Sequence, residues 1–298
     1  MERYFKKWFP LLILPAIVLF TLVIAVPFLE GVVYSFTNWR GTYFQGGEHW
    51  WNGFSGIKNY LKIFRNRDFL GALGYTTKYA VIAVVIQNII SLLLALLIQK
   101  IVKGKGFFRT VYFFPYLLGG LAMGYVWRFI FENVFTNILF GGSSIFHVEA
   151  LRNMLQSSNK ALFAFAILTT WQAAGYYLLI YLNGLNNIPK DLYEAAAIDG
   201  ASAFYTFRRV TLPLLMPSFT VVLFLSLSGS FKMLDANIAL TEGNFNTTMI
   251  SFQILKTARE TSPPEYGLAQ AQAVIFFLIV AVISITQVIL TKKREVEA

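Results

Sequence analysis

The sequence lacks cysteine and contains only two histidines among its 298 residues. Without cysteine the chain can form no disulfide framework, no thiolate metal site and no cysteine nucleophile. The histidines, His49 and His147, are too few for a metal cluster of the ordinary kind. We therefore expect no bound metal, no cofactor and no catalytic residues in this chain.

Charged side chains are also scarce. They make up 13% of the sequence, whereas soluble chains carry about 25%. Apolar side chains reach 56% and aromatic ones 17%, so the polar surface is too small to coat a globule in water. We therefore expect an integral membrane protein, with lipid as the solvent of most of the chain.

Long stretches with little or no charge occur six times. A helix needs about 20 mostly apolar residues to cross a hydrocarbon layer of ~30 Å. None of the stretches alternates with the period of two that barrel strands show, and lipid cannot hydrogen-bond exposed backbone, so each is predicted as a helix. The expected spans are residues 8–29, 69–98, 110–131, 161–185, 213–236 and 266–291. The predicted fold is all-α, with about six transmembrane helices.

The first span also resembles a secretory signal peptide. Arg3, Lys6 and Lys7 precede its apolar run, as a basic n-region would. The run is too long for a signal peptide, however, and no small-residue cleavage site follows Leu29. We expect the segment to be retained as a membrane span.

Lysine and arginine gather beside alternate span ends, which sets the expected orientation. The basic residues assigned to the cytoplasmic side are Arg3, Lys6, Lys7, Lys100, Lys103, Lys105, Arg109, Lys190, Arg208, Arg209, Lys292, Lys293 and Arg294. With six spans, both termini are then cytoplasmic. This topology explains the net charge of +10 without a nucleic-acid partner.

Three parts are expected along the chain. Residues 1–68 hold the first span and a long extracytoplasmic loop, residues 69–291 hold the other five spans, and residues 292–298 form a cytoplasmic tail. The outer loop contains three tryptophans, Trp39, Trp50 and Trp51. Tryptophan is enriched at membrane interfaces, so an aromatic belt is favoured over a docking site for an external partner.

The loop 188–217, between the expected fourth and fifth spans, has strong local signals. Pro189 followed by Asp191 predicts a helix start, because proline suits the first turn and an acidic group suits its positive dipole end. Gly200 permits a turn, after which residues 201–207 can resume as a short helix. An ordinary amphipathic elbow at the membrane surface would show the same features.

The residues of this loop also follow a specific pattern. They run Glu194-Ala195-Ala196-x-x-Asp199-Gly200-Ala201, then Phe207, Leu212-Pro213 and Pro217. This pattern resembles the EAA loop of binding-protein-dependent ABC importer permeases. Elements that look like carbohydrate permeases of the maltose type are Phe114-Pro115-Tyr116, Thr170-Trp171, Tyr176, Gly184-Leu185, Phe231-Lys232 with Asp235, and Tyr266-Gly267. The turn after the fifth span departs from the Thr-x-Gly-Gly-Pro common in that family and reads Thr241-Glu242-Gly243-Asn244-Phe245.

The resemblance implies a chain that hydrolyses nothing itself. In agreement, Gly104-Lys105-Gly106 lacks the upstream glycine and the Ser/Thr of a Walker loop. ATP and magnesium would bind to two separate nucleotide-binding subunits. The other expected partners are a second, related permease subunit forming a heterodimer, an extracellular solute-binding protein, membrane lipid and a sugar. The expected location is a bacterial or archaeal plasma membrane.

The resemblance also assigns roles in the loop. The loop would transmit closure of the ATPase subunits to the spans, which would alternate between inward-open and outward-open states. The expected coupling residues are Glu194, Ala195, Ala196, Asp199, Gly200, Ala201, Phe204, Phe207 and Pro213. Phe204 and Phe207 would be apolar anchors, and Glu194 or Asp199 would pair with the partner or brace the elbow.

Candidate substrate residues lie mostly within the spans. The positions where maltose-type permeases contact sugar correspond to Tyr116, Gly120, Ser230, Lys232 and Gln253. Polar or aromatic neighbours chosen by composition are Trp171, Gln172, Tyr176, Tyr177, Ser226 and Ser228. Asp235 joins the set beside Lys232, although the two could simply neutralise each other. Helix packing explains Gly120 with Gly124 equally well, and core packing explains the aromatic residues.

Two other classes of transporter remain open. An ABC permease for a non-sugar solute, such as glycerol phosphate or a polyamine, would carry the same loop. An ion-coupled secondary transporter would need carboxylates deep in the spans, and the sequence places Glu132 and Asp235 near the outer ends instead.

Overall fold

The computed structural model describes residues 2–101, 103–140 and 148–295, and the second histidine, His147, lies outside these ranges. The described residues form helices and connecting loops, with isolated β-bridges such as Thr37 to Phe54. The α-helices are α1 (Glu2–Phe20), α2 (Val26–Ser35), α3 (Lys58–Arg65), α4 (Arg67–Lys100), α5 (Lys105–Phe113), α6 (Gly120–Phe129), α7 (Ser158–Asn186), α8 (Lys190–Ile198), α9 (Ala203–Thr206), α10 (Leu212–Leu214), α11 (Met216–Phe231), α12 (Asp235–Thr241), α13 (Ile250–Arg259) and α14 (Tyr266–Lys292). The all-α prediction is confirmed.

Four helices in the described part of the chain are long and apolar enough to cross a membrane, and a bent pair could form a fifth crossing. The four are Leu12–Ser35, Arg67–Lys100, Ser158–Asn186 and Tyr266–Lys292, and the bent pair joins Ala203–Leu214 to Met216–Phe231 at 70°. These helices correspond to five of the six predicted spans. The first span extends to Ser35, six residues beyond its predicted end.

The predicted third span, 110–131, is not one helix. α5 gives way to a 3₁₀ turn at Phe114–Leu117, the backbone is extended at Gly119, and α6 follows. Pro115 cannot donate a backbone hydrogen bond, and Gly119 adds flexibility, so the helical ladder breaks between them. A π-helical stretch, Ile130–Leu139, continues beyond α6.

The predicted fifth span, 213–236, also has different bounds. Its straight part is α11, which ends at Phe231 with Lys232 as the C-terminal capping residue. A cation is favourable at this negative end of a helix. A new helix, α12, starts at Asp235, so the sequence 213–236 covers a bend, a helix and the start of another.

The chain divides into two compact units. The first comprises residues 1–70 and 253–278, and the second comprises 71–252 and 279–298. In the first unit, α2 packs on the start of α14: Phe28 and Phe277 have ring centres 5.1 Å apart, and Gly31 faces Gln270. No residue in the most apolar window of Leu12–Ser35 is buried.

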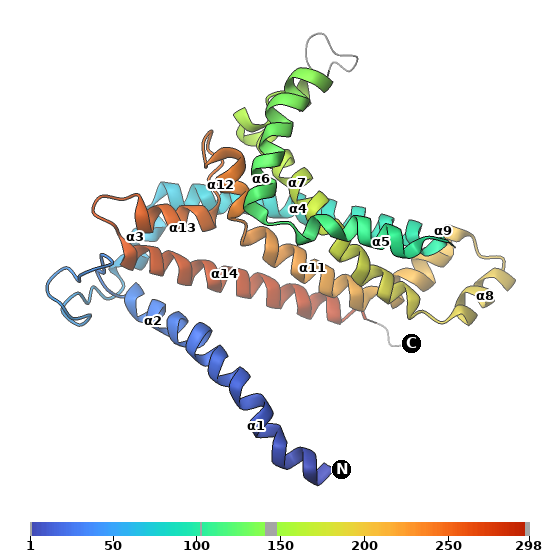
Figure 1. Cartoon of the computed structure of the whole chain (residues 1–298), viewed down its shortest axis with the longest axis horizontal. Helices are drawn as coiled ribbons and strands as arrows, with labels where there is room; N and C mark the ends of the chain where they lie inside the picture. The colour runs from blue at the N-terminus through green and yellow to red at the C-terminus, as the bar shows by residue number, and fades with distance from the viewer. Residues whose placement is uncertain (1, 102, 141–147, 296–298) are drawn as a thin grey trace. The chain divides into compact units, whose positions relative to one another are not determined.

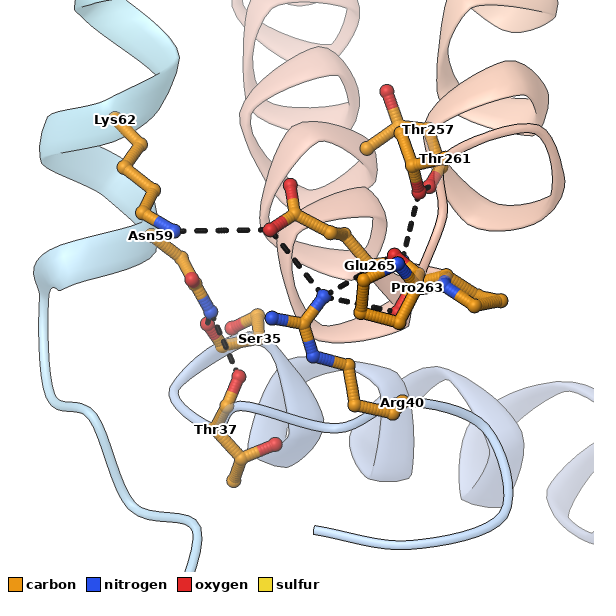
Figure 2. A network of polar contacts seen from close by, with 10 residues as sticks. Ser35, Thr37, Arg40, Asn59, Lys62, Thr257, Thr261, Pro263 and Glu265 are labelled. Carbon is orange, nitrogen blue, oxygen red and sulfur yellow. Dashed lines mark hydrogen bonds and ion pairs between the residues drawn. The ribbon is translucent and has the colours of Figure 1, made fainter. Parts of the chain in front are cut away.

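A polar network ties the long loop of the first unit to the start of α14 (Figure 2). Arg40 donates to the carbonyl oxygens of Pro263 and Pro264 at 3.4 and 3.2 Å, and to Glu265 Oε1 at 3.4 Å. Lys62 Nζ lies 3.8 Å from the same carboxylate oxygen. The loop is therefore an ordered cap joined to residues about 220 positions away in sequence.

In the second unit, α4, α7 and α11 share a buried polar contact. Tyr181 donates its hydroxyl to Asn88 Oδ1 at 2.7 Å, and Asn88 Nδ2 donates to Ser226 Oγ at 3.0 Å. Tyr181 also belongs to an apolar cluster with Leu178, Leu182 and Leu215, and a second apolar cluster in this unit contains Phe131 and Phe165. Three helices are thus joined by hydrogen bonds where water is excluded.

Candidate functional site

The predicted helix–glycine–helix elbow forms one end of the second unit (Figure 1). Pro189 is the N-terminal capping residue of α8, so the helix begins at Lys190, one residue after the predicted start at Pro189. Asp191 lies in the first turn. An acidic group there is stabilised by the helix dipole. The alanine-rich sequence that follows has high helix propensity, which accounts for α8.

Gly200 closes α8 in a Schellman motif. Its N–H donates to the Ala197 carbonyl at 3.1 Å, and the N–H of Ala201 donates to the Ala196 carbonyl at 2.9 Å. Gly200 has φ +70°, in the left-handed region that glycine adopts at little cost. An added Cβ would meet no atom within 4 Å, so the backbone angle, and not packing, requires glycine here.

The return limb of the elbow begins at α9. Ser202 caps this helix by accepting a hydrogen bond from the Tyr205 N–H at 3.3 Å. A π-helical turn, Phe207–Thr211, leads into α10. The Tyr193 hydroxyl on α8 lies 3.3 Å from Thr211 Oγ1 and joins the two limbs. The predicted helix over 201–207 is confirmed in position, with its first residue at Ala203.

The elbow exposes large apolar side chains beside a hollow. Ile198 is 87% exposed and Phe204 is 71% exposed, whereas Phe207 is half-buried. The hollow has a volume of about 730 Å³ and is lined by Leu192, Ala195, Ala196, Asp199, Gly200, Ala201, Ser202, Tyr205 and Val210. Exposed apolar groups of this size mark contact surfaces.

All nine predicted coupling residues lie on this elbow: Glu194, Ala195, Ala196, Asp199, Gly200, Ala201, Phe204, Phe207 and Pro213. Ile198, at an unspecified position of the pattern, was not among the predicted residues, although it is the most exposed apolar side chain of the elbow. The sequence signal for its exposure was an isoleucine between Ala197 and Asp199, next to the glycine turn.

Charges on the elbow make few internal contacts. Glu194 and Asp199 are both exposed, and neither forms an ion pair within the described residues. The expected alternative of an internal ionic brace is therefore not observed. The Arg209 guanidinium lies over the Tyr205 ring, with its carbon 5.9 Å from the ring centre.

A second group of candidate residues forms an aromatic stack in the second unit. Tyr116, on the 3₁₀ turn, and Tyr176, on α7, have parallel rings 4.6 Å apart with an interplanar angle of 14°. Tyr177 continues the contact from α7, with its ring centre 5.8 Å from that of Tyr176. Tyr116 is 44% exposed, so one side of the stack is open.

Two α7 residues position the interrupted helix that carries Tyr116. Gly175 allows the backbone of Tyr112 to approach so closely that an added Cβ would overlap its carbonyl group. Gln172 donates its side-chain amide to the Leu118 carbonyl at 3.0 Å, which satisfies an acceptor freed by the break. Gln172, chosen as a polar candidate by composition, thus has a structural partner.

Trp171 occupies a different environment. Its ring meets Trp127 edge-on, with centres 5.6 Å apart, and it lines a cleft of about 810 Å³. The cleft walls on α4, α5 and α7 are mainly apolar, with Ile90, Leu94 and Phe163 among them. Tyr116 and Tyr176 are not part of these walls. Such walls suit apolar chains better than sugar hydroxyls.

Gly120 and Asp235 lie together where α6 packs beside α12 (Figure 1). A Cβ at Gly120 would lie 2.8 Å from Asp235 Oδ2, and one at Gly124 would overlap the Ala239 side chain. The small residues therefore serve helix packing, as one alternative anticipated. Lys232 and Asp235 are both exposed and form no ion pair in the described chain, so mutual neutralisation by direct contact is not observed.

The remaining substrate candidates belong to both compact units. Ser230 is buried in α11, and its hydroxyl has no hydrogen-bond partner among the described residues. Gln253 belongs to the first unit, where its amide donates to Thr257 Oγ1 at 3.4 Å within α13. The structure thus brings together Tyr116 with Tyr176 and Gly120 with Asp235 within the second unit.

Residues 87–296 match the family described as the binding-protein-dependent transport system inner membrane component, and this range includes the whole elbow. The chain belongs to this family. This chain is 40% identical to the probable starch degradation products transport system permease protein AmyD of Thermoanaerobacterium thermosulfurigenes, over 99% of this chain and 98% of that protein. It is 32% identical to the multiple sugar-binding transport system permease protein MsmF of Streptococcus mutans, over 98% and 97% of the two chains.

This chain also has the fold of a chain from a bacterial ABC transporter involved in importing the acidic polysaccharide alginate. The TM-score is 0.78, the identity is 19%, and 98% of each chain is covered. At this identity the likeness concerns the fold. The shared fold is helical and covers 98% of this chain.

Proposed function

We propose that this chain is a permease subunit of an ATP-driven sugar importer, coupled through the elbow at residues 188–217 to an ATPase that it does not contain. The observation that carries the proposal is the elbow itself: a capped helix, a left-handed glycine and a second short helix that present Ile198 and Phe204 to the surroundings. Exposed apolar side chains beside a hollow provide a surface on which the ATPase subunit can dock.

Sugar as the substrate is supported by two independent observations. Relatives that match almost the whole chain are named for starch degradation products and for multiple sugars. In addition, the Tyr116–Tyr176 stack presents an open aromatic face of the kind that packs against a pyranose ring. The proposed complex contains a second permease subunit, two ATPase subunits and an extracellular solute-binding protein.

The proposed mechanism is a shift between two populations. ATP binding favours closed ATPase subunits, and the elbow transmits this preference because it contacts them differently in the two states. The membrane spans would then shift from the inward-open to the outward-open state when ATP binds. Both chain termini would lie in the cytoplasm.

The proposal is tested by purifying the chain with its associated subunits from its native membrane and measuring ATP hydrolysis with different sugars. We expect two ATPase chains in the complex and a rise in hydrolysis with sugar-loaded binding protein. Tyr116→Ala should raise the sugar concentration for half-maximal stimulation by about tenfold, which corresponds to about 1.4 kcal/mol.

Phe114→Ala is the matched control, because Phe114 is an exposed aromatic residue on the same 3₁₀ turn. It should leave the half-maximal concentration within about twofold of the original value, since less than about 0.4 kcal/mol is then lost. Absence of any ATPase chain would contradict the coupling proposal. Equal effects of the two substitutions would remove Tyr116 from the sugar site and leave coupling intact.

A further inference from the structure

The short helix α3 in the first unit has three separate faces. Asn59 and Ile63 are buried, at 3% and 0% exposure. The next stripe is apolar and exposed, and its members are Ile57, Leu61 and Phe64, at 62%, 56% and 64% exposure. The third stripe is basic and exposed, and its members are Lys58, Lys62 and Arg65. Residues three and four apart share one side of a helix, so each set forms a continuous face.

The buried face fixes α3 to the end of a membrane-crossing helix. Asn59 Nδ2 donates to the Ser35 carbonyl at 2.9 Å and to the Thr37 carbonyl at 2.8 Å (Figure 2). The Tyr60 hydroxyl lies 2.6 Å from Ser35 Oγ. Ser35 is the last residue of the span Leu12–Ser35, so this anchor places α3 at the membrane surface.

The other end of α3 leads directly into a second membrane-crossing helix. Only Asn66 separates Arg65 from α4, and Asn66 Oδ1 accepts a hydrogen bond from the Phe69 N–H at 3.0 Å. The step from Arg65, the last residue of α3, to Arg67, the first residue of α4, therefore covers about 7 Å at most. Because both ends of α3 are held at span ends, its exposed faces cannot lie far from the lipid headgroups.

The charge of this segment indicates which headgroups it meets. Residues 57–68 contain four basic side chains, Lys58, Lys62, Arg65 and Arg67, and one acidic side chain, Asp68. Lys62 is 3.8 Å from Glu265 and is partly neutralised. Lys58 and Arg65 take part in no ion pair within the described residues, which leaves two basic groups beside the exposed apolar stripe.

We propose that α3 is an interfacial helix that binds anionic phospholipid headgroups through Lys58 and Arg65 while Leu61 and Phe64 enter the boundary of the acyl layer. Helices with aromatic and aliphatic residues on one side and lysine or arginine on the other lie in this plane. The exposed tryptophans of the preceding loop, Trp50 and Trp51, are typical of the same depth.

The depth of α3 is tested by spin labelling the full chain in nanodiscs of four parts phosphatidylcholine to one part phosphatidylglycerol. Because the chain has no cysteine, Phe64→Cys provides a unique attachment site. The label should be relaxed more by oxygen, which enters lipid, than by a water-soluble nickel chelate. Ile198→Cys, at the exposed tip of the elbow, is the control and should show the reverse order. Equal behaviour at the two positions would overturn the proposal.

Headgroup selectivity is tested by the double variant Lys58→Gln with Arg65→Gln. Each basic group near an anionic surface contributes about fivefold in affinity, so removing both should weaken phosphatidylglycerol retention by about 25-fold. Lys58→Arg with Arg65→Lys preserves the charge and should stay within about twofold of the original chain. Unchanged retention in the glutamine variant would overturn the proposal.

A solute-binding protein is the competing occupant of this surface. It would protect the Phe64→Cys label from the nickel chelate only after it was added, and equally in nanodiscs with and without phosphatidylglycerol. That result would also overturn lipid binding. Protection without added protein, stronger when phosphatidylglycerol is present, is the result that we expect.

Discussion

Gly200 shows how a single residue defines the elbow. Its φ of +70° closes the Schellman motif, while the space around it is open. The left-handed conformation costs a residue with a Cβ atom roughly 1–2 kcal/mol, and asparagine tolerates it better than β-branched residues do.

We therefore expect Gly200→Asn to keep most of the transport activity and Gly200→Val to lose most of it, on the order of tenfold, because valine opposes the left-handed backbone. Uptake of labelled sugar by cells is the measurement, with membrane insertion checked by blotting. If both substitutions abolished uptake equally, the partner surface would need the absence of a side chain, and the backbone explanation would fail.

At the residue scale, the sequence predicted the elbow well because its signals are local. Proline before α8, acid in its first turn, alanines and then glycine each act over a few residues. The Tyr116–Tyr176 stack could not be predicted, because it joins residues 60 positions apart through packing that no local pattern contains. The structural role of Gln172 was hidden for the same reason: its partner is a carbonyl freed by a break in another helix.

At the scale of helices, hydrogen bonds among α4, α7 and α11 hold the second unit together in lipid. Asn88 is central, since it bonds to both Tyr181 and Ser226 and also to the Val84 carbonyl in its own helix. Interhelical bonds of this kind contribute about 0.6 kcal/mol on average and up to about 1.7 kcal/mol each.

Asn88→Leu should therefore lower the free energy of unfolding by about 1–3 kcal/mol, because it removes two interhelical bonds and leaves the Tyr181 hydroxyl without its partner, whereas the Ser226 hydroxyl keeps its bond to the Leu223 carbonyl. Denaturation of the full chain in mixed micelles measures this change. Thr77→Val on the same helix is the control, since the exposed Thr77 hydroxyl bonds only to the Leu73 carbonyl of α4. Similar losses for both variants would contradict a special role for Asn88.

Apolar length predicted α4, α7 and α14 to within a few residues, since each is long and carries few charges. It failed for residues 110–131, because composition alone treats Pro115, Gly119 and Gly120 as part of an apolar run. Their backbone properties, a missing donor and high flexibility, interrupt the helix despite that composition.

At the scale of the whole molecule, the proposed orientation places the elbow and the long outer loop on opposite sides of the membrane. The absence of cysteine allows a direct test. Ile198→Cys, at the exposed tip of the elbow, should react with a membrane-impermeant maleimide only after the cells are opened. Asn52→Cys should react in intact cells. Reaction of both positions from the same side would contradict the six-crossing topology.

The contact between Gly175 and the Tyr112 carbonyl limits how the protein can move. Two main chains touch there with no layer of side chains between them, and even one methyl group would force them apart. Sliding of one helix along the other would drive neighbouring side chains into that gap. α5 and α7 must therefore move together as one rigid body. Any rotation that opens a path for solute has its hinge outside this pair of helices.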